Sequence, residues 1–407
     1  MHPQQPFGKE FKWFISARAF FVMALRMVAV AMVWHVSILT KNTLSVGILG
    51  LSEVIPAVGF ALYAGHVVDI SDKRKLLVKC ITFYCLALLL LILFTSHLVE
   101  KKYSQELIVW AIYFCIFLTG IIRSFSGPAM NALLAQIVPR ESLSKAITIS
   151  SASWQTASVI GPLLTGFLIS MQGISFTLSI IFIFVIMALV SMLAIAPKPV
   201  QFMAGERKTW ESVMDGLKFV FKTKAILGAM CLDMFAVFFG GATAMLSFYV
   251  TDVLKVSAIW FGWLNAATSI GAIGTLIVIS IKPISKRQGK VLLYAVAGFG
   301  TCIIVFGLSK LLWLSIGALF ISGIFDGISV VIRSTILQLY VPDEMRGRVS
   351  SVNSIFINSS NELGQFESGV AARLLGTVPS VVFGGVVTLI VVFTTWFKAP
   401  TLRKLQY

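Results

Sequence analysis

Long apolar segments recur along the whole chain, and this feature limits the possible folds more than any other. Of the 407 residues, 57% are hydrophobic, and the mean hydropathy is +0.92. An α-helix needs about 20 apolar residues to cross the hydrocarbon core of a bilayer. We find twelve such segments, at roughly 14–36, 45–68, 76–96, 106–138, 146–170, 174–196, 225–250, 258–281, 291–309, 311–340, 349–374 and 379–397. The sequence therefore predicts an all-α integral membrane protein with twelve transmembrane helices.

Basic residues are distributed unevenly between the connecting loops. The formal net charge of +16 at pH 7 would suggest nucleic acid as the partner of a soluble protein. Here the bases lie in short loops, where positive charge keeps a loop in the cytoplasm. The loops on the side opposite the termini hold few of them, namely Lys41, Lys101, Lys102, Lys255 and Lys310. We therefore expect both termini in the cytoplasm, a lipid bilayer as surroundings and no nucleic acid.

The two halves of the chain repeat each other. An offset of 203 residues aligns identical residue types at Pro139 and Pro342, Glu141 and Glu344, Gly161 and Gly364, and Gly166 and Gly369. Two related bundles with a site between them near the bilayer midplane form a common transporter plan. The sequence thus predicts an N-terminal six-helix bundle at 1–196, a cytoplasmic linker at 197–224 and a C-terminal six-helix bundle at 225–407.

The linker contains one amphipathic segment, from Trp210 to Phe221. Helical spacing places Trp210, Val213, Leu217 and Val220 on one face of it. Such a segment is typical of a helix that lies at the membrane surface. A basic linker with no role beyond joining the halves is the alternative.

The segment 65–75, GHVVDISDKRK, concentrates charge between the second and third apolar segments. It resembles the loop between helices 2 and 3 of the major facilitator superfamily, usually written G-x-x-x-D-R-x-x-R-R. The pattern is kept at Gly65, Asp69, Lys73 and Arg74. Ile70 stands where the family usually has a base.

The resemblance implies a cytoplasmic gate, in which ion pairs at the rim hold one conformation and break in each cycle. Its predicted members are Gly65, Asp69, Lys73, Arg74, Arg346 and Arg348. The last two form the equivalent rim between helices ten and eleven. A role limited to orienting the loops is the alternative.

Further segments extend the resemblance over nearly the whole chain. They are 34–40, 44–51, 328–335, 341–349 and 361–369. Within the superfamily, the chain is most similar to the bacterial drug and siderophore exporters, including the enterobactin exporter group. This resemblance implies alternating access, a small-molecule substrate and a place in the bacterial inner (cytoplasmic) membrane. We also expect a monomer.

Residues 161–166 resemble the antiporter motif of helix five, which ends in G-P-x-x-G-G. The matching positions are Gly161, Pro162 and Gly166, while Thr165 replaces a glycine. The motif implies exchange of the substrate against an ion. A proline inside a helix also produces a kink, and small residues allow close packing. A purely structural kink is therefore the alternative.

Ionisable residues inside a membrane are costly unless they are paired or hydrated, so they are candidates for function. The candidates for a central cavity and proton coupling are Arg26, Arg123, Asp233, Asp326, Arg333, Glu362 and Glu367. The 203-residue offset aligns Arg123 with Asp326, and these opposite charges pair either between the bundles or each within its own. We hypothesise that Asp326 binds the proton that drives export, with Glu362 or Glu367 as the second candidate. A static network of salt bridges is the alternative.

Several other functions are disfavoured by the sequence. The five cysteines all lie inside apolar segments and the four histidines are scattered, so we expect no metal site. No phosphate-binding loop or catalytic constellation is evident, so we expect no cofactor and no enzyme activity. The favoured function is secondary active, proton-coupled export of amphipathic, drug- or siderophore-like molecules. Import or facilitated diffusion of a nutrient or lipid-like solute is the alternative, and a non-transporting receptor or scaffold is a remoter one.

Overall fold

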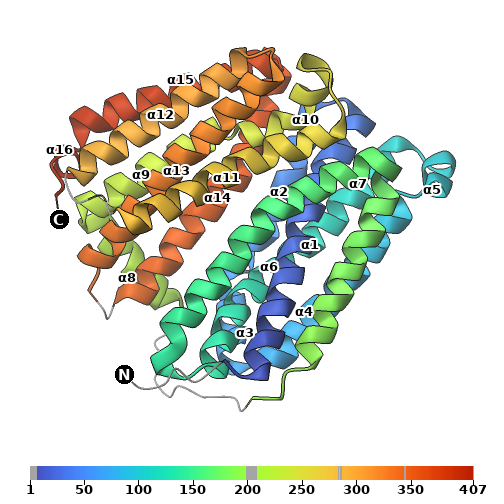
Figure 1. Ribbon diagram of the computed structural model, residues 1–407, viewed down its shortest axis with the longest axis horizontal. Coiled ribbons are helices and arrows are strands. Elements are labelled where there is room, and N and C mark those ends of the chain that lie inside the picture. Colours follow the sequence, from blue (N-terminus) through green and yellow to red (C-terminus); the bar gives the residue numbers. More distant parts are fainter. Residues whose placement is uncertain (1–6, 199–208, 283, 285–286, 343–344, 407) are drawn as a thin grey trace. The chain divides into compact units, whose positions relative to one another are not determined.

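The computed structural model describes residues 7–198, 209–282, 284, 287–342 and 345–406, and every regular element among them is a helix (Figure 1). The chain divides into two compact units. The first comprises residues 1–35 and 55–206, and the second comprises residues 36–54 and 207–407. The prediction of an all-α membrane fold is thereby confirmed. The predicted domain boundaries at 196 and 224 remain a prediction.

The first unit contains the helices of the N-terminal half. They are most of α1 (Lys9–Thr40), the end of α2 (Thr43–Gly59), α3 (Ala61–Ile70), α4 (Lys73–Phe94), α5 (His97–Lys102), α6 (Gln105–Ile137), η1 (Arg140–Ser142) and α7 (Leu143–Leu193). Helix α4 packs against α6 and α7. Its start is fixed by Asp72, whose carboxylate accepts a hydrogen bond from the backbone N–H of Lys75 at 3.0 Å.

Besides the end of α1 and the start of α2, the second unit contains the helices that follow α7. They are α8 (Thr209–Lys222), α9 (Lys224–Gly240), η2 (Ala242–Met245), α10 (Leu246–Phe248), η3 (Tyr249–Val253), α11 (Ala258–Ile281), α12 (Gln288–Leu308), α13 (Leu312–Tyr340), α14 (Arg346–Leu375), α15 (Thr377–Lys398) and α16 (Pro400–Arg403). Helix α13 packs against α11 and α12, and α12 packs against α15. A β-carbon on Gly323 of α13 would collide with the carbonyl oxygen of Thr268 on α11. Glycine is therefore needed for this close approach.

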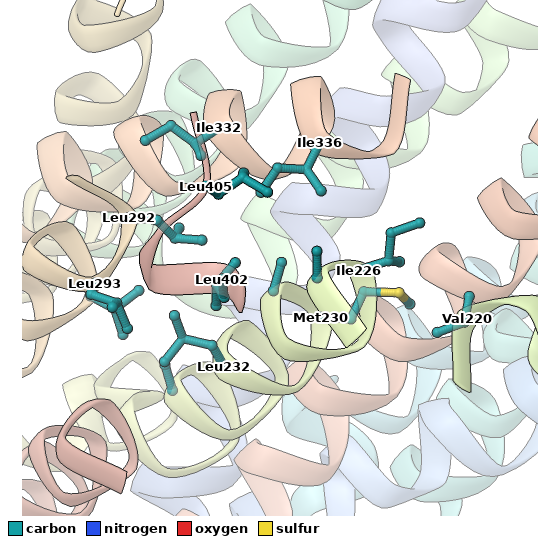
Figure 2. Close-up of a cluster of buried hydrophobic side chains, with 14 of the residues drawn as sticks. Val220, Ile226, Met230, Leu232, Leu292, Leu293, Ile332, Ile336, Leu402 and Leu405 are labelled. Atoms are coloured by element: carbon teal, nitrogen blue, oxygen red, sulfur yellow. The ribbon is translucent and has the colours of Figure 1, made fainter. Parts of the chain in front are cut away.

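One apolar cluster joins several helices of the second unit (Figure 2). Ile226 and Met230 of α9, Leu292 of α12 and Ile336 of α13 all contribute to it. Leu402 of α16 and the nearby Leu405 also belong to it and are buried. The end of the described chain is thus part of the packed interior.

Eight helices in the described part of the chain are long and apolar enough to cross a membrane, or nine if α8 and α9 count as one bent span. The predicted number of twelve therefore remains a prediction. Helix α7 covers the two predicted segments 146–170 and 174–196. Its backbone leaves the helical conformation between them, at Gly173, where φ is 77°. The predicted segment 45–68 is split between α2 and α3. Helix α14 covers the predicted segment 349–374, but it is too polar to be counted among the eight apolar helices.

Candidate functional site

The most buried charges of the second unit form a cluster between α9 and α13. Nη1 of Arg333 donates a hydrogen bond to Oδ2 of Asp233 in an ion pair. Only 9% of Arg333 and 7% of Asp233 are exposed. Nε of Arg333 also donates to Oγ of Ser329 at 3.2 Å. Helix α13 thus presents a guanidinium that is held by α9 on one side and by its own preceding turn on the other.

Asp326 is the third charged member of this cluster. It lies seven residues before Arg333 on α13, and residues at this spacing share a helix face. It interacts electrostatically with both Arg333 and Asp233. Two carboxylates therefore share one guanidinium, so the cluster has an excess negative charge when both carboxylates are ionised. A single bound proton would neutralise it.

A small cavity adjoins these charges. Asp233, Asp326 and Ser329 supply its polar lining. Its other lining residues are apolar or aromatic, namely Ala236, Val237, Val296, Phe299 and Phe325. The cavity has room for about one water molecule, so these polar groups and aromatic rings surround a very small space. Glu362 and Glu367, which are half-buried on α14, are not among the lining residues.

In the first unit, Arg26 lies over an aromatic ring. Its guanidinium carbon lies 4.7 Å from the centre of the Trp154 ring on α7, within the range of a cation–π interaction. A β-carbon on Gly161 would lie only 3.1 Å from the β-carbon of Arg26. The antiporter-like segment therefore lies directly against Arg26. Trp154 was not predicted from the sequence, although it precedes Gly161 by two helical turns and so lies on the same face of α7.

The turn that follows Gly161 contains a side-chain hydrogen bond. Pro162 lacks a backbone N–H and therefore cannot donate to the carbonyl oxygen of Ser158, four residues earlier. Oγ1 of Thr165 donates to the carbonyl oxygen of Gly161 at 2.8 Å, and both Thr165 and Gly166 are buried. The threonine that departs from the family pattern thus supplies a hydrogen bond inside this turn.

Among the predicted gate residues of the first unit, Arg74 forms a hydrogen bond within that unit. Nη2 of Arg74 donates to the carbonyl oxygen of Leu193, the last residue of α7, at 2.8 Å. A cation at a helix C-terminus is electrostatically favourable. Lys73 is buried, and the space around the α-carbon of Gly65 is open. The side chain of Asp69 lies outside the described part of the structure.

The predicted gate residue Arg348 contacts a helix that the prediction had not linked to it. Its Nη1 atom lies 3.1 Å from Oδ2 of Asp215 on α8, where the two form an ion pair. A β-carbon on Gly216 would lie 2.9 Å from the carbonyl oxygen of Arg348. The side chain of Arg346 lies outside the described residues.

Arg123 and Asp326 belong to different units. Arg123 is half-buried on α6 of the first unit, whereas Asp326 lies on α13 of the second. Within its own unit, Asp326 has Arg333 as a neighbouring cation. The pairing of Arg123 with Asp326 between the bundles therefore stays a prediction.

A glycine contact in the second unit joins the start of α2 to α14. A β-carbon on Gly369 would lie 2.8 Å from the α-carbon of Gly47. Oγ1 of Thr43 donates to the carbonyl oxygen of Gly369 at 3.2 Å. The sequence singled out Gly369 only as the counterpart of Gly166. Its contact with Gly47 was not predicted.

Known families and curated proteins resemble this chain along most of its length. The Major Facilitator Superfamily matches residues 14–365. The enterobactin exporter EntS of Shigella flexneri is 24% identical over 401 residues, which cover 97% of this chain and 93% of the exporter. The enterobactin exporter EntS of Escherichia coli O127:H6 aligns with the same identity and coverage.

Several solved transporter structures have a similar fold. A POT family transporter in complex with 5-aminolevulinic acid has a TM-score of 0.76 at 12% identity, with 98% of each chain covered. The nucleoside transporter NupG has a TM-score of 0.72 at 13% identity, covering 98% of this chain and 100% of the other. A bacterial homologue of the human lysosomal transporter Spinster has a TM-score of 0.74 at 14% identity, covering 100% of this chain and 99% of the other. At these identities the likeness establishes the fold alone.

Proposed function

Because the chain belongs to the Major Facilitator Superfamily, we propose that it is a proton-coupled exporter of amphipathic small molecules that works by alternating access. Membership makes it a multi-pass membrane transporter rather than an enzyme. The direction, the coupling ion and the substrate class belong to the proposal. So do the two six-helix bundles at 1–196 and 225–407, the linker at 197–224 and the monomeric state.

The observation that carries the proposal is the sharing of Arg333 by Asp233 and Asp326. The guanidinium is hydrogen-bonded to Asp233, so Asp326 has the less direct share of the positive charge. A buried charge without full compensation is costly, and binding a proton removes that cost. Asp326 is therefore the residue at which we place the transported proton. Asp233 and Arg333 act as its positioning residues.

The residues beside Asp326 combine apolar and polar character, and this combination is the basis for proposing an amphipathic substrate. Phe299 and Phe325 offer aromatic surface, and Ser329 offers a hydroxyl next to the carboxylates. In the first unit, Trp154 and the guanidinium of Arg26 offer a second aromatic and polar combination. We propose that both groups face the substrate during the cycle. A static role for the charged cluster predicts no change in transport when Asp326 loses its ability to ionise.

Export and location are supported by sequence observations. The similarity to enterobactin exporters extends over 97% of the chain, so a siderophore-like or drug-like compound is the first substrate class to test. The concentration of Lys and Arg in loops on the side of the termini supports cytoplasmic termini. We place the protein in the bacterial inner membrane on this basis.

Uptake or facilitated diffusion is the second candidate function. It remains open because membership of the family fixes neither the direction of transport nor the substrate. The two functions differ in the direction of movement relative to the proton gradient. A receptor without transport would show no movement in either direction.

The experiment is a transport measurement in everted membrane vesicles, in which an exporter fills the lumen. Vesicles with and without the protein are energised to acidify the lumen and exposed to fluorescent amphipathic dyes and catecholate siderophores. We expect protein-dependent accumulation that collapses when a protonophore removes the gradient. Accumulation that persists without the gradient would contradict proton coupling. Protein-dependent accumulation only in right-side-out vesicles would establish import.

A further inference from the structure

Helix α8 is oriented unlike the helix that follows it. The axis of Met214–Lys222 makes an angle of 101° with that of Lys224–Gly240, across a break at Thr223. The second of these helices, α9, opens the predicted membrane segment 225–250. Membrane-spanning helices tilt by about 20° on average from the bilayer normal. An α8 that is nearly perpendicular to such a helix runs close to the plane of the membrane surface.

One face of α8 is held by the protein. Val220 is fully buried in the apolar cluster of the second unit, and Leu217 packs against the same cluster. Gly216 packs against the backbone of Arg348, and Asp215 forms an ion pair with the Arg348 side chain. The apolar face predicted to lie on the membrane surface therefore packs, at Leu217 and Val220, against the protein interior. The side chains of Trp210 and Val213 lie outside the described residues.

The rest of the described part of α8 carries an exposed basic and aromatic patch. Lys218 and Lys222 are exposed one turn apart, and exposed Lys224 follows at the start of α9. Phe221, between them in sequence, is 60% exposed. Asp215, the acid nearest in sequence to these lysines among the described side chains, forms an ion pair with Arg348. The patch therefore has a net positive charge beside an aromatic ring.

We propose that α8 is an interfacial anchor that binds the anionic phospholipids of the cytoplasmic leaflet through Lys218, Lys222 and Lys224. Phe221 lies at the boundary between headgroups and acyl chains, where an aromatic ring is favourable. The occupant follows from the positive charge of the patch, from its continuity with α9 at the start of the predicted membrane segment 225–250, and from the orientation of α8. Helices with a basic face and an exposed aromatic residue bind such surfaces. This anchor is independent of the substrate and of the coupling ion.

The proposed contact has a consequence for the gate. Arg348 lies in the first turn of α14. Its ion pair with Asp215 connects α14 to α8, the helix that carries Lys218 and Lys222. A lipid surface that holds α8 therefore also restrains the start of α14. Each lysine near an anionic surface is expected to contribute about a fivefold factor in binding, and salt should weaken it.

The test uses hydrogen–deuterium exchange of the full-length protein in nanodiscs, read by mass spectrometry. One set contains phosphatidylcholine alone, and the other contains equal parts of phosphatidylcholine and phosphatidylglycerol. We expect backbone amides of residues 214–222 to exchange about fivefold more slowly, or slower still, in the anionic discs, because lysine–lipid contacts restrain opening of the helix. The readout is independent of transport, so it stands or falls separately from the proposed function.

Two triple variants complete the test. In Lys218→Gln/Lys222→Gln/Lys224→Gln, the difference between the two lipid compositions should disappear. Lys101→Gln/Lys102→Gln/Lys310→Gln removes the same charge from exposed lysines of the opposite loops, and it should keep the difference. Equal exchange of 214–222 in both lipids for the unmodified protein would overturn the proposal. Loss of the lipid effect in the second variant would also overturn it.

Discussion

Arg333 of α13 and Asp233 of α9, which are one hundred residues apart in the chain, form a buried ion pair. Removing the cation of a buried pair leaves its acid uncompensated, which typically costs about 3–5 kcal/mol. We therefore expect Arg333→Met, which takes the cation from both Asp233 and Asp326, to lower the thermal unfolding temperature of the detergent-purified protein markedly. The double variant Asp233→Asn/Arg333→Met should be more stable than Arg333→Met alone, because only one carboxylate then loses its cation. A double variant that loses the sum of both single effects would contradict the pairing.

Gly369 and Gly47 lie too close for a side chain at Gly369. Gly369→Leu should separate α2 from α14 and destabilise the protein by about 1–3 kcal/mol, which is typical of overpacking. The same substitution at Gly274 of α11, around which the space is open, is the matched control. Thermal unfolding and transport are measured for both variants. Equal effects at the two positions would show that the contact between Gly47 and Gly369 is unimportant.

Leu402 ties the end of the chain to the core of the second unit. It is fully buried, so Leu402→Ala should cost about 2–5 kcal/mol through lost burial and a new cavity. Leu308 is 63% exposed, and Leu308→Ala is therefore expected to have a much smaller effect. The measurement is the unfolding temperature of the two variants in the same detergent. Similar temperatures would argue against the packed position of Leu402.

Trp154 holds the guanidinium of Arg26 through its ring. Trp154→Ala should remove a cation–π contribution of about 0.5–2 kcal/mol, whereas Trp154→Phe should retain part of it. If Arg26 faces the substrate, as we propose, the alanine variant should also have a higher KM for transport than the phenylalanine variant. Both variants are compared by unfolding temperature and by initial rates over a range of substrate concentrations. Indistinguishable alanine and phenylalanine variants would contradict a role for the ring.

The membrane fold and several site residues were predictable, because the signals for them are local. Hydropathy over about 20 residues identifies a span, and an ionisable residue inside a span stands out by itself. Asp233, Asp326 and Arg333 were found in this way, and the helix at 209–222 was found from its periodicity. The break at Phe60 was not predicted, since the apolar composition continues on both sides of it, whereas the break at Gly173 lies between the predicted segments 146–170 and 174–196.

Partners across helices were not predictable from the sequence. Which residue faces Arg333 depends on the rotation and tilt of α9 and α13, and these follow from the packing of the whole unit. The same reason applies to Asp215 with Arg348 and to Trp154 with Arg26. Arg74 is a further example: its role in a gate remains a prediction, and the motif did not indicate its hydrogen bond to the carbonyl oxygen of Leu193 at the end of α7.

The proton role of Asp326 is tested most directly by substrate accumulation in everted vesicles that carry Asp326→Asn. Asparagine keeps the size of the side chain but cannot exchange a proton. We predict that accumulation driven by the pH gradient is lost in this variant. Asp252→Asn, which changes an exposed aspartate of η3 in the same way, should leave it unchanged. Undiminished gradient-driven accumulation in the Asp326→Asn vesicles would contradict the account.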